Sequence, residues 1–425
     1  MSIKQIFYSW KASCVAAVLA VAFGLGGAAA ADLTIAIPAG SEGDGLKAAA
    51  SDYEQLKHIK IDIVQAPYAN LLEKAQNAGA QKSGAYDIVL MDDPWLPLFA
   101  ENNYLEPLGS YFKTAGTDGP DNDFLGKSLA LCRNPYNTGP YVCLPYVGNA
   151  QMFFYDPDQF GKHGVTGAPK SWDDVIRVAG EISKEGNGQN FGYVMRAAEG
   201  NPVVADFMPI FWSYGGQLFD DKRQPNLLTP EAHKAMEIFL QLKQVSPPGV
   251  ESFNADEVGT YMAQGRAASS INWPNWVATF EDPSQSKVVG KIAYTKIPDG
   301  TRAGTSEIGH WLMGIMRAAK HKKAAFDFMV WATSPEEIKK SAMRGNPPVR
   351  FSVFTDPELT SQPQFRHFPT LMNAINFSTP RPRHPKWPEI ENALGAELSK
   401  AVAGQQSADQ ALMNAQEAIK KIVAR

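Results

Sequence analysis

Apolar and polar residues are arranged along the chain in patterns that predict both strands and helices. Short runs rich in Ile, Val and Leu at 33–37, 59–64 and 86–91 have the length and composition of buried strands. Apolar residues recur every three or four positions from 46 to 56, and a helix is also predicted over about 69–80. The order strand, helix, strand, helix, strand indicates a parallel sheet with right-handed crossovers. We therefore predict an α/β fold.

Residues typical of helix N-caps mark the start of further helices. Ser171 and Thr229, the second followed by Pro, each predict a helix start. Ser334 and Ser407 begin segments with capping-box spacing, and the last of these carries one apolar stripe that should face a core. The Pro-rich stretch 380–385 is expected to be extended and to lie on the surface.

The first 31 residues have the pattern of a secretory signal peptide. Lys4 and Lys11 precede an uncharged apolar run at 15–25, and four consecutive alanines at 28–31 offer a cleavage site. No later segment approaches the ~18 consecutive apolar residues that a membrane-spanning helix needs. We expect a soluble secreted protein that begins at Asp32, with enough chain left for two or three domains of ~100–200 residues.

Charge and cysteine content narrow the class of partner. A formal net charge of −4, with no basic tract, argues against nucleic acid or anionic lipid as the main partner. Cys132 and Cys143 flank a turn-rich stretch at 133–142, and a disulfide closing this loop is expected in an oxidising compartment. A redox or metal pair is the alternative, but there is no CxxC motif and no His between the two cysteines.

The chain contains few arrangements that could support catalysis. The segment 43–48 fits GxGxxA, but it begins six residues past its strand, and we interpret it as a loop that leads into a helix. Asp92 and Asp93 could suggest an acid/base pair, but neighbours on a strand end should point to opposite sides. The seven His residues are scattered without metal-ligand spacing. We predict no enzymatic activity, no cofactor and no metal.

Tryptophan and polar residues gather at the predicted ends of elements. Flat aromatic rings cover the apolar C–H faces of a sugar, while Asp, Asn, Gln and Arg side chains bind its hydroxyls. Ligands of open α/β sheets lie at the carboxyl ends of strands, where such residues should meet. Trp172 and Trp331 lie within helical patterns and are expected to pack in cores. The tryptophans expected in a binding cleft are Trp95, Trp212, Trp273, Trp276 and Trp311.

Several segments together resemble the extracellular solute-binding proteins of sugar ABC importers, the broad family of maltose-binding protein. The likeness runs in the expected order through nearly all of residues 32–425. It rests on the segments 32–38, 86–95, 99–108, 144–156, 171–174, 309–315 and 381–385. Two departures are His310, where Gly is frequent, and the Cys132 and Cys143 pair, which is not a general family feature.

The resemblance implies a type II periplasmic binding protein with two α/β lobes, each built on a mainly parallel sheet and joined by a hinge. It places 32–147 and 309–345 in the N-terminal lobe, and 148–308 and 346–425 in the C-terminal lobe. It further implies a periplasmic monomer that captures a sugar or polyol and delivers it to a membrane permease. The ligand contacts it suggests are Ser41, Glu42, Asp92, Asp93, Trp95, Gly148, Asn149, Gln151, Trp212, Gly215, Asn272, Trp273, Trp276, His310, Trp311, Arg344 and Arg350.

Two alternatives stay open at the level of the sequence. The same fold could bind a sugar acid, another anion or a polyamine, with His310, Arg344 or Arg350 available to an anion. A secreted carbohydrate-active hydrolase would need a carboxylate pair or a nucleophile that the sequence does not reveal. In the binding interpretation, a ligand that touches both lobes favours the closed form by its differential contacts.

Overall fold

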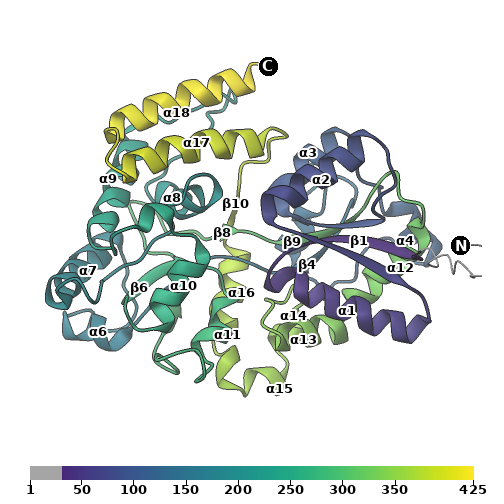
Figure 1. The fold of residues 1–425 in the computed structure, drawn as a ribbon, viewed down its shortest axis with the longest axis horizontal. Coiled ribbons are helices and arrows are strands. Elements are labelled where there is room, and N and C mark those ends of the chain that lie inside the picture. The colour runs from purple at the N-terminus through teal and green to yellow at the C-terminus, as the bar shows by residue number, and fades with distance from the viewer. Residues whose placement is uncertain (1–30) are drawn as a thin grey trace, which may run out of the picture.

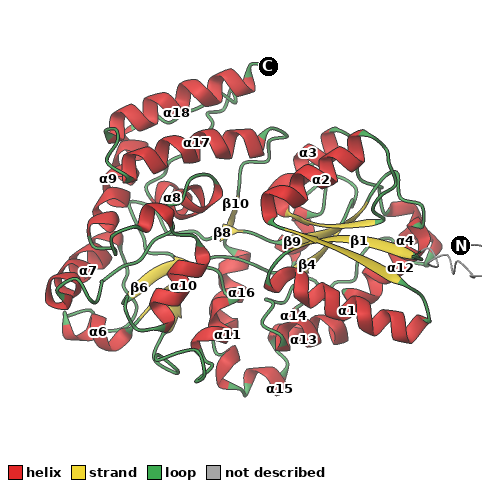
Figure 2. Cartoon of the chain, in the orientation of Figure 1, coloured by secondary structure: helices red, strands yellow, loops and turns green. Residues whose placement is uncertain are grey.

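Residues 31–425 are described by a computed structural model, and they form two lobes that lie side by side (Figure 1). All but the last residue of the predicted signal peptide lie outside these described residues. Figure 2 shows that each lobe combines strands with surrounding helices, which agrees with the predicted α/β class. Among residues 31–425, every helix is either too short or too polar to span a bilayer.

The first lobe contains a five-stranded sheet in the order β2-β1-β3-β9-β4. The predicted parallel arrangement is confirmed for the first three strands, since β1 pairs in parallel with both β2 and β3. Strand β9 returns from the second lobe and therefore runs antiparallel to its neighbours β3 and β4. The strands are β1 (Leu33–Pro38), β2 (Ile61–Ala66), β3 (Ile88–Asp92), β4 (Leu144–Val147) and β9 (Trp311–Ile315).

The second lobe contains a three-stranded sheet in the order β6-β5-β7. Its strands pair antiparallel, which differs from the mainly parallel sheet expected for both lobes. The central strand leads into the lobe, and each neighbouring strand runs back alongside it. The strands are β5 (Met152–Tyr155), β6 (Ser269–Asn272) and β7 (Ala293–Thr295).

A parallel pair of very short strands, β8 (Glu307–Ile308) and β10 (Thr379–Pro380), lies between the lobes (Figure 1). Beside it, the chain leaving β4 crosses to β5, and Ala150 forms an antiparallel bridge with Ile308. Three stretches of chain that are remote in sequence therefore run together where the lobes meet. We call this region the hinge; it comprises residues 148–151, 307–310 and 379–383.

Helices cover both sheets, and they begin where the capping residues predict. The side chains of Ser171, Thr229, Ser334 and Ser407 each accept a backbone N–H bond at the start of a helix. The helices are α1 (Ser41–Lys57), α2 (Tyr68–Ala80), α3 (Leu96–Glu101), α4 (Gly109–Thr114), α5 (Gly126–Leu131), α6 (Pro157–Lys162), α7 (Trp172–Gly186), α8 (Asn201–Ser213), α9 (Pro230–Gln244), α10 (Ala255–Ala263), α11 (Trp276–Phe280), α12 (Lys322–Ala332), α13 (Pro335–Met343), α14 (Phe351–Phe354), α15 (Pro357–Thr360), α16 (Phe368–Asn376), α17 (Trp387–Val402) and α18 (Ala408–Val423).

The GxGxxA segment lies within the first turns of α1, so the loop interpretation is wrong for residues 43–48. A Cβ atom at Gly43 would lie only 1.9 Å from the carbonyl oxygen of Pro38 at the end of β1. The glycine therefore allows α1 to start directly beside the strand end. This close approach places Ser41 and Glu42 at the edge of the sheet, facing the other lobe.

The chain that follows α13 stays on the first lobe before it joins the second. The backbone N–H of Leu125 donates to Val349 at 3.0 Å, and that of Phe351 donates to Asp123 at 2.7 Å. The residues from 346 on were assigned to the second lobe from the sequence. We propose instead that the lobe limit follows α14, because these contacts hold α14 against the first lobe.

Cys132 and Cys143 are both buried, and both are free thiols. The disulfide expected from their spacing is therefore not present in the structure. The two residues are nevertheless neighbours, because the N–H of Val142 donates to the carbonyl of Cys132 at 3.0 Å. Burial raises the pKa of the Cys132 thiol well above its usual value, which keeps this thiol protonated.

Candidate functional site

Aromatic rings meet at the ends of β3 and β9, on the side of the first lobe that faces the second. Asp92 at the end of β3 lies opposite Trp311 at the start of β9. Trp95 follows in the next turn, and its ring lies 5.9 Å from that of Trp311 at an angle of 78°. Tyr68 at the start of α2 completes the group: its hydroxyl donates to Asp92 Oδ2 at 2.8 Å and accepts from Trp95 Nε1 at 3.1 Å. These rings form an aromatic wall with a carboxylate at its base.

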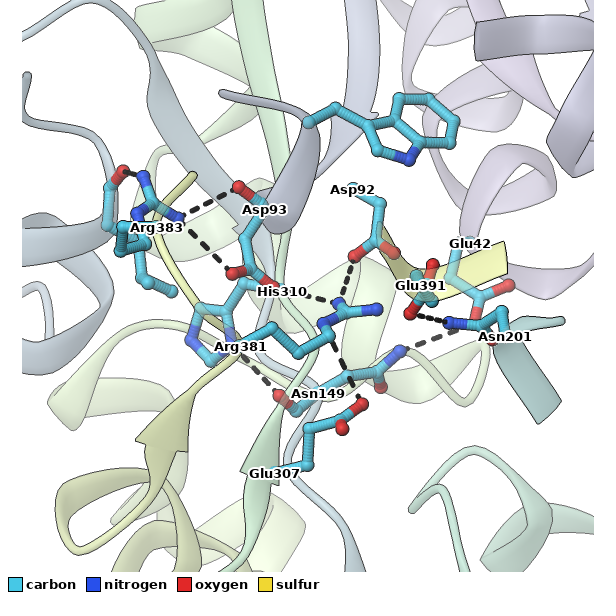
Figure 3. Close-up of polar contacts among 12 residues, drawn as sticks. Glu42, Asp92, Asp93, Asn149, Asn201, Glu307, His310, Arg381, Arg383 and Glu391 are labelled. Atoms are coloured by element: carbon cyan, nitrogen blue, oxygen red, sulfur yellow. Dashed lines mark hydrogen bonds and ion pairs between the residues drawn. The ribbon is translucent and has the colours of Figure 1, made fainter. Parts of the chain in front are cut away.

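A buried arginine from the hinge binds the two aspartates at the end of β3 and lies close to β8. Arg381 is 1% exposed, and its Nη2 donates to Asp92 Oδ1 at 2.7 Å and to Asp93 Oδ1 at 3.0 Å. Arg383 donates to the carbonyl oxygen of Asp93 at 2.9 Å. On the other side, Arg381 Nε lies 3.7 Å from Oε1 of Glu307, which is fully buried in β8. Figure 3 shows Arg381 between the two aspartates and Glu307.

The two lobes touch across the space beside the hinge. Asn149 Nδ2 donates to Glu42 Oε1 at 3.3 Å, and Asn275 Nδ2 in the loop after β6 donates to Ser41 Oγ at 3.1 Å. Both acceptors lie in the first turn of α1, while Asn275 comes from the second lobe and Asn149 from the hinge. Of the two bonds, the one between Asn275 and Ser41 joins the lobes directly, and it requires the lobes to approach each other.

A cavity of about 600 Å³ opens from the aromatic wall between α2 and the starts of α8 and α17. Its volume lies in the range of small-molecule sites. Within the described chain, no Lys or Arg side chain lines it. Asn201 Nδ2 donates to Glu391 Oε1 at 2.8 Å at the C-terminal side of the cavity. The residues that line it include Tyr68, Gln76, Trp95, Glu199, Asn201 and Glu391.

Burial raises the pKa of one carboxyl group that lines the cavity, Glu391, and of three that lie at the hinge or the strand ends nearby. The pKa of Glu307 rises to about 8 and that of Glu391 to about 7, because burial outweighs the opposing charge of Arg381. The pKa of Asp93 rises to about 6 for the same reason, and burial also raises that of Glu42. A carboxyl group that holds its proton near neutral pH can donate as well as accept a hydrogen bond.

Residues 39–339 match the family model described as bacterial extracellular solute-binding protein. The chain belongs to this family. A solute-binding protein from Agrobacterium radiobacter, solved in complex with ribitol, is 27% identical and superposes with a TM-score of 0.84 over 92% of this chain and 98% of that one. The fold is therefore that of a type II, two-lobed periplasmic binding protein, as the sequence predicts.

Curated relatives of this solute-binding protein carry different ligand names. The mannitol-binding protein of Pseudomonas aeruginosa is 25% identical over 80% of each chain. A probable amino-acid ABC transporter periplasmic-binding protein of Sinorhizobium fredii is 26% identical over 76% of this chain and 73% of that one.

In this solute-binding protein a first group of the predicted contact residues lies where the lobes meet, and among the predicted residues Trp95 lines the cavity of about 600 Å³. Trp95 and Trp311 belong to the wall described above, and Asp92 lies at its base. Ser41 bonds to Asn275 of the second lobe, and Glu42 bonds to Asn149 of the hinge. Trp273 packs at the hinge, where a Cβ on Gly309 would lie 2.7 Å from its ring, and the Arg196 guanidinium lies 5.2 Å from the ring centre. Asp92, Trp273 and Trp311 thus meet around a single region, although their chain positions are remote.

Asp92 and Asp93 do not point to opposite sides, which corrects the expectation for neighbours on a strand. The strand ends at Asp92, and Asp93 begins a short 3-10 turn, so side chains no longer alternate. Both carboxylates therefore reach the same guanidinium of Arg381.

A second group of predicted residues supports the hinge from within. His310 is fully buried, with Nδ1 at 3.0 Å from the carbonyl oxygen of Asn149 and Nε2 at 2.8 Å from Ser128 Oγ. Gln151 donates to the carbonyl of Ala205, and Gly148 packs against the backbone of 347–348. These residues fix the course of the hinge segments.

The remaining predicted residues lie away from the aromatic wall. Asn272 Nδ2 donates to the backbone of α10, and Trp276 packs its ring against Gly259. Trp212 and Gly215 line a separate cavity of about 580 Å³ in the second lobe. Arg344 lies 4.0 Å from Asp52 on the first lobe.

Arg350 is buried in the first lobe, where it binds Asp121 and Asp123 and is not directed at the cleft. Trp172 is fully buried and Trp331 is partly buried against Tyr53, in agreement with their predicted packing roles.

Several cleft residues carried no clear signal in the sequence. The Pro-rich stretch 380–385 was expected on the surface, yet it delivers the buried Arg381, because the prolines on either side hold the backbone extended through the hinge. A buried charge cannot be recognised from such a pattern. The other cleft residues missed from the sequence are Tyr68, Arg196, Asn201, Asn275, Glu307 and Glu391.

Proposed function

We propose that this protein captures a sugar or polyol in the cleft between its lobes and delivers it, in the periplasm, to the permease of an ABC importer. The observation that carries the proposal is the aromatic wall of Tyr68, Trp95 and Trp311 with the Asp92 carboxylate at its base. Such a wall covers the C–H face of a polyhydroxylated solute, while the carboxylate accepts from a hydroxyl. Relatives named for mannitol and solved with ribitol support the same class of solute.

The mechanism follows from the contacts between the lobes. A solute that touches the first-lobe wall and the second-lobe side chains Asn201 and Glu391 adds binding energy only when the lobes approach. Its differential contacts therefore shift the population toward the closed form, which the Ser41–Asn275 bond also stabilises. A permease can then distinguish the loaded form from the empty one by the relative position of the lobes.

The proposal includes further expectations. The protein acts as a monomer and without a cofactor, it is exported by cleavage after residue 31, and it releases its solute chemically unchanged. Support for the last expectation comes from the family model and from the relatives, which are binding proteins.

A thermal-shift screen of the mature protein tests the solute class. The protein is unfolded and refolded to remove bound solute, and then mixed with polyols, neutral sugars, sugar acids, amino acids and polyamines. At a ligand concentration of 100 times Kd the folded state gains about 2.7 kcal/mol, so a rise in Tm of several degrees is expected with a polyol or neutral sugar. A rise with amino acids alone would contradict the proposal. Mass spectrometry of the recovered solute then tests for turnover, and any change in its mass contradicts a binding role.

A further inference from the structure

Glu307 presents a buried carboxyl group whose hydrogen bonds are not made within residues 31–425. Its side chain is fully buried, and neither carboxylate oxygen has a hydrogen-bond partner there. Its nearest opposite charge is Arg381 Nε at 3.7 Å, beyond hydrogen-bond distance. Arg381 Nε lacks a partner as well, although Nη2 of the same guanidinium bonds to Asp92 and Asp93. A buried acceptor and a buried donor thus lie side by side without satisfying each other.

Asn149 adds a second acceptor at the same place. Its Nδ2 donates to Glu42, which fixes the amide so that Oδ1 is the atom left over, and this oxygen is buried without a partner in the described chain. The hinge backbone holds Asn149 and Glu307 together, since Gly309 N–H donates to the Asn149 carbonyl at 2.9 Å and Gln151 N–H donates to the Glu307 carbonyl at 3.0 Å. Figure 3 shows the side chains of Asn149, Glu307 and Arg381 close to one another, with Glu391 and Asn201 nearby. We call Asn149, Glu307 and Arg381 the hinge triad.

The chemistry of the hinge triad restricts what can satisfy it. Each unmet buried polar group costs about 1–3 kcal/mol, so a ligand that meets several of them at once gains correspondingly. A group placed between Glu307 and Arg381 Nε must accept from the guanidinium, and it must donate to Glu307 when that carboxyl group is ionised or accept from it when it is protonated. A hydroxyl can do both in either state, an ammonium group cannot accept from Nε, and a carboxylate cannot donate to an ionised Glu307.

The surrounding charges act against both charged alternatives. The arginines near the triad are already paired, Arg381 with Asp92 and Asp93 and Arg196 with Asp206, so an anionic solute finds no unpaired guanidinium of residues 31–425 there. An ammonium group placed in the triad would approach the guanidinium of Arg381. The charged groups that face Glu307 are Asp93, Arg196, Arg381 and Glu391, and those that face Arg381 also include Asp92.

We propose that the hinge triad holds one hydroxyl of the solute, which donates to Glu307 and accepts from Arg381 Nε, with Asn149 accepting from a neighbouring hydroxyl. The inference rests on the proposed function and deepens it. It makes the site specific for neutral polyhydroxylated solutes and selective against the corresponding acids and amines. It also ties the solute directly to the segments about which the lobes move.

Isothermal titration calorimetry with D-mannitol as the first probe tests the triad. The test compares the wild type with Glu307→Gln and with a control variant, Glu337→Gln. Glu337 suits the control because it is also a buried glutamate with one unpartnered oxygen in the described chain, but it lies in α13 of the first lobe. If the thermal-shift screen ranks another polyol first, that polyol replaces D-mannitol. We expect Glu307→Gln to weaken binding by tenfold or more and Glu337→Gln to leave the affinity within twofold of wild type. Glu307→Asp, which keeps the carboxyl group but moves it back by one methylene, serves as a second variant if Glu307→Gln folds poorly.

Deoxy analogues of the probe make the test specific. We expect removal of one particular hydroxyl from the probe to lower its affinity for the wild type by tenfold or more. Removal of the same hydroxyl should lower the affinity for the Glu307 variant much less. The analogous acid and the analogous 1-amino-1-deoxy compound should each bind the wild type at least tenfold more weakly than the polyol. Equal losses for every deoxy analogue in both proteins, or an acid that binds as tightly as the polyol, would overturn the triad proposal. If no sugar or polyol binds the wild type at all, the proposed function itself fails.

Discussion

Replacement of Arg381 by Met removes the one positive charge that Asp92 and Asp93 share. Both aspartates are buried, 5% and 0% exposed, and each accepts one bond from Nη2 of this residue, at 2.7 and 3.0 Å. Breaking a buried ion pair by removing one partner costs about 3–5 kcal/mol, since it leaves an uncompensated buried charge. Asp92 keeps its bond from Tyr68, and Asp93 keeps those from Arg383. We therefore expect a loss at the lower end of this range, about 3 kcal/mol in the free energy of unfolding at pH 7.5.

The loss of stability in Arg381→Met should become smaller as the pH falls. Burial raises the folded-state pKa of Asp93 from 3.8 to about 6 even though Arg381 opposes this, and removal of the arginine raises the pKa further. A carboxyl group whose folded-state pKa lies above its unfolded value stabilises the folded state as the pH falls through that window. The deficit of Arg381→Met should therefore shrink between pH 7.5 and pH 5, because the protonated Asp93 needs no counter-charge.

Urea unfolding at both pH values, followed by tryptophan fluorescence and circular dichroism, measures these quantities. Arg350→Met is the matched control, because Arg350 is equally buried but its partner Asp121 has a side chain that is 60% exposed and can be hydrated. Burial raises the pKa of Asp121, but the bond and the charge of Arg350 outweigh it, so the net shift is downward and the control should not regain stability at pH 5. A loss below about 1 kcal/mol for Arg381→Met, or a loss that is the same at both pH values, would refute the reasoning.

Three further predictions follow from single contacts. Trp273→Ala should weaken solute binding with little loss of fold, since the ring packs at the hinge and not within a lobe core; unchanged affinity by calorimetry would remove Trp273 from the site. His310 should stay neutral above about pH 5, because burial lowers its pKa to about 4, and an NMR titration that shows a midpoint near 6.5 would contradict this. Gly43→Ala should lower Tm and also weaken binding, because the new methyl group would collide with the Pro38 carbonyl and displace the first turn of α1; a thermal scan and a titration that both match wild type would exclude such a displacement.

Local sequence patterns were enough to predict the first three strands, their order and several helix starts. Runs such as 86–91 read as buried strands because a strand covered on both faces needs apolar residues at nearly every position. Helix starts at Ser171 and Ser334 were readable because an N-cap is a local interaction between residues three positions apart. Candidate residues at strand ends, such as Asp92 and Trp311, followed from the same local patterns and from the family resemblance.

Which polar residues share the space between the lobes could not be predicted from local patterns, because it depends on how distant segments fold together. Arg381, Glu307 and Asp92 come from three distant segments, and nothing local to any of them shows that it is buried. The same holds for Arg344 and Arg350, which look alike in the sequence, although one lies near Asp52 on the first lobe and the other is buried within it. A helix cap or an apolar run depends on neighbours along the chain, whereas the pairing of a buried charge depends on neighbours in space. The hinge segments bring Arg381 and Glu307 together in space beside Asp92.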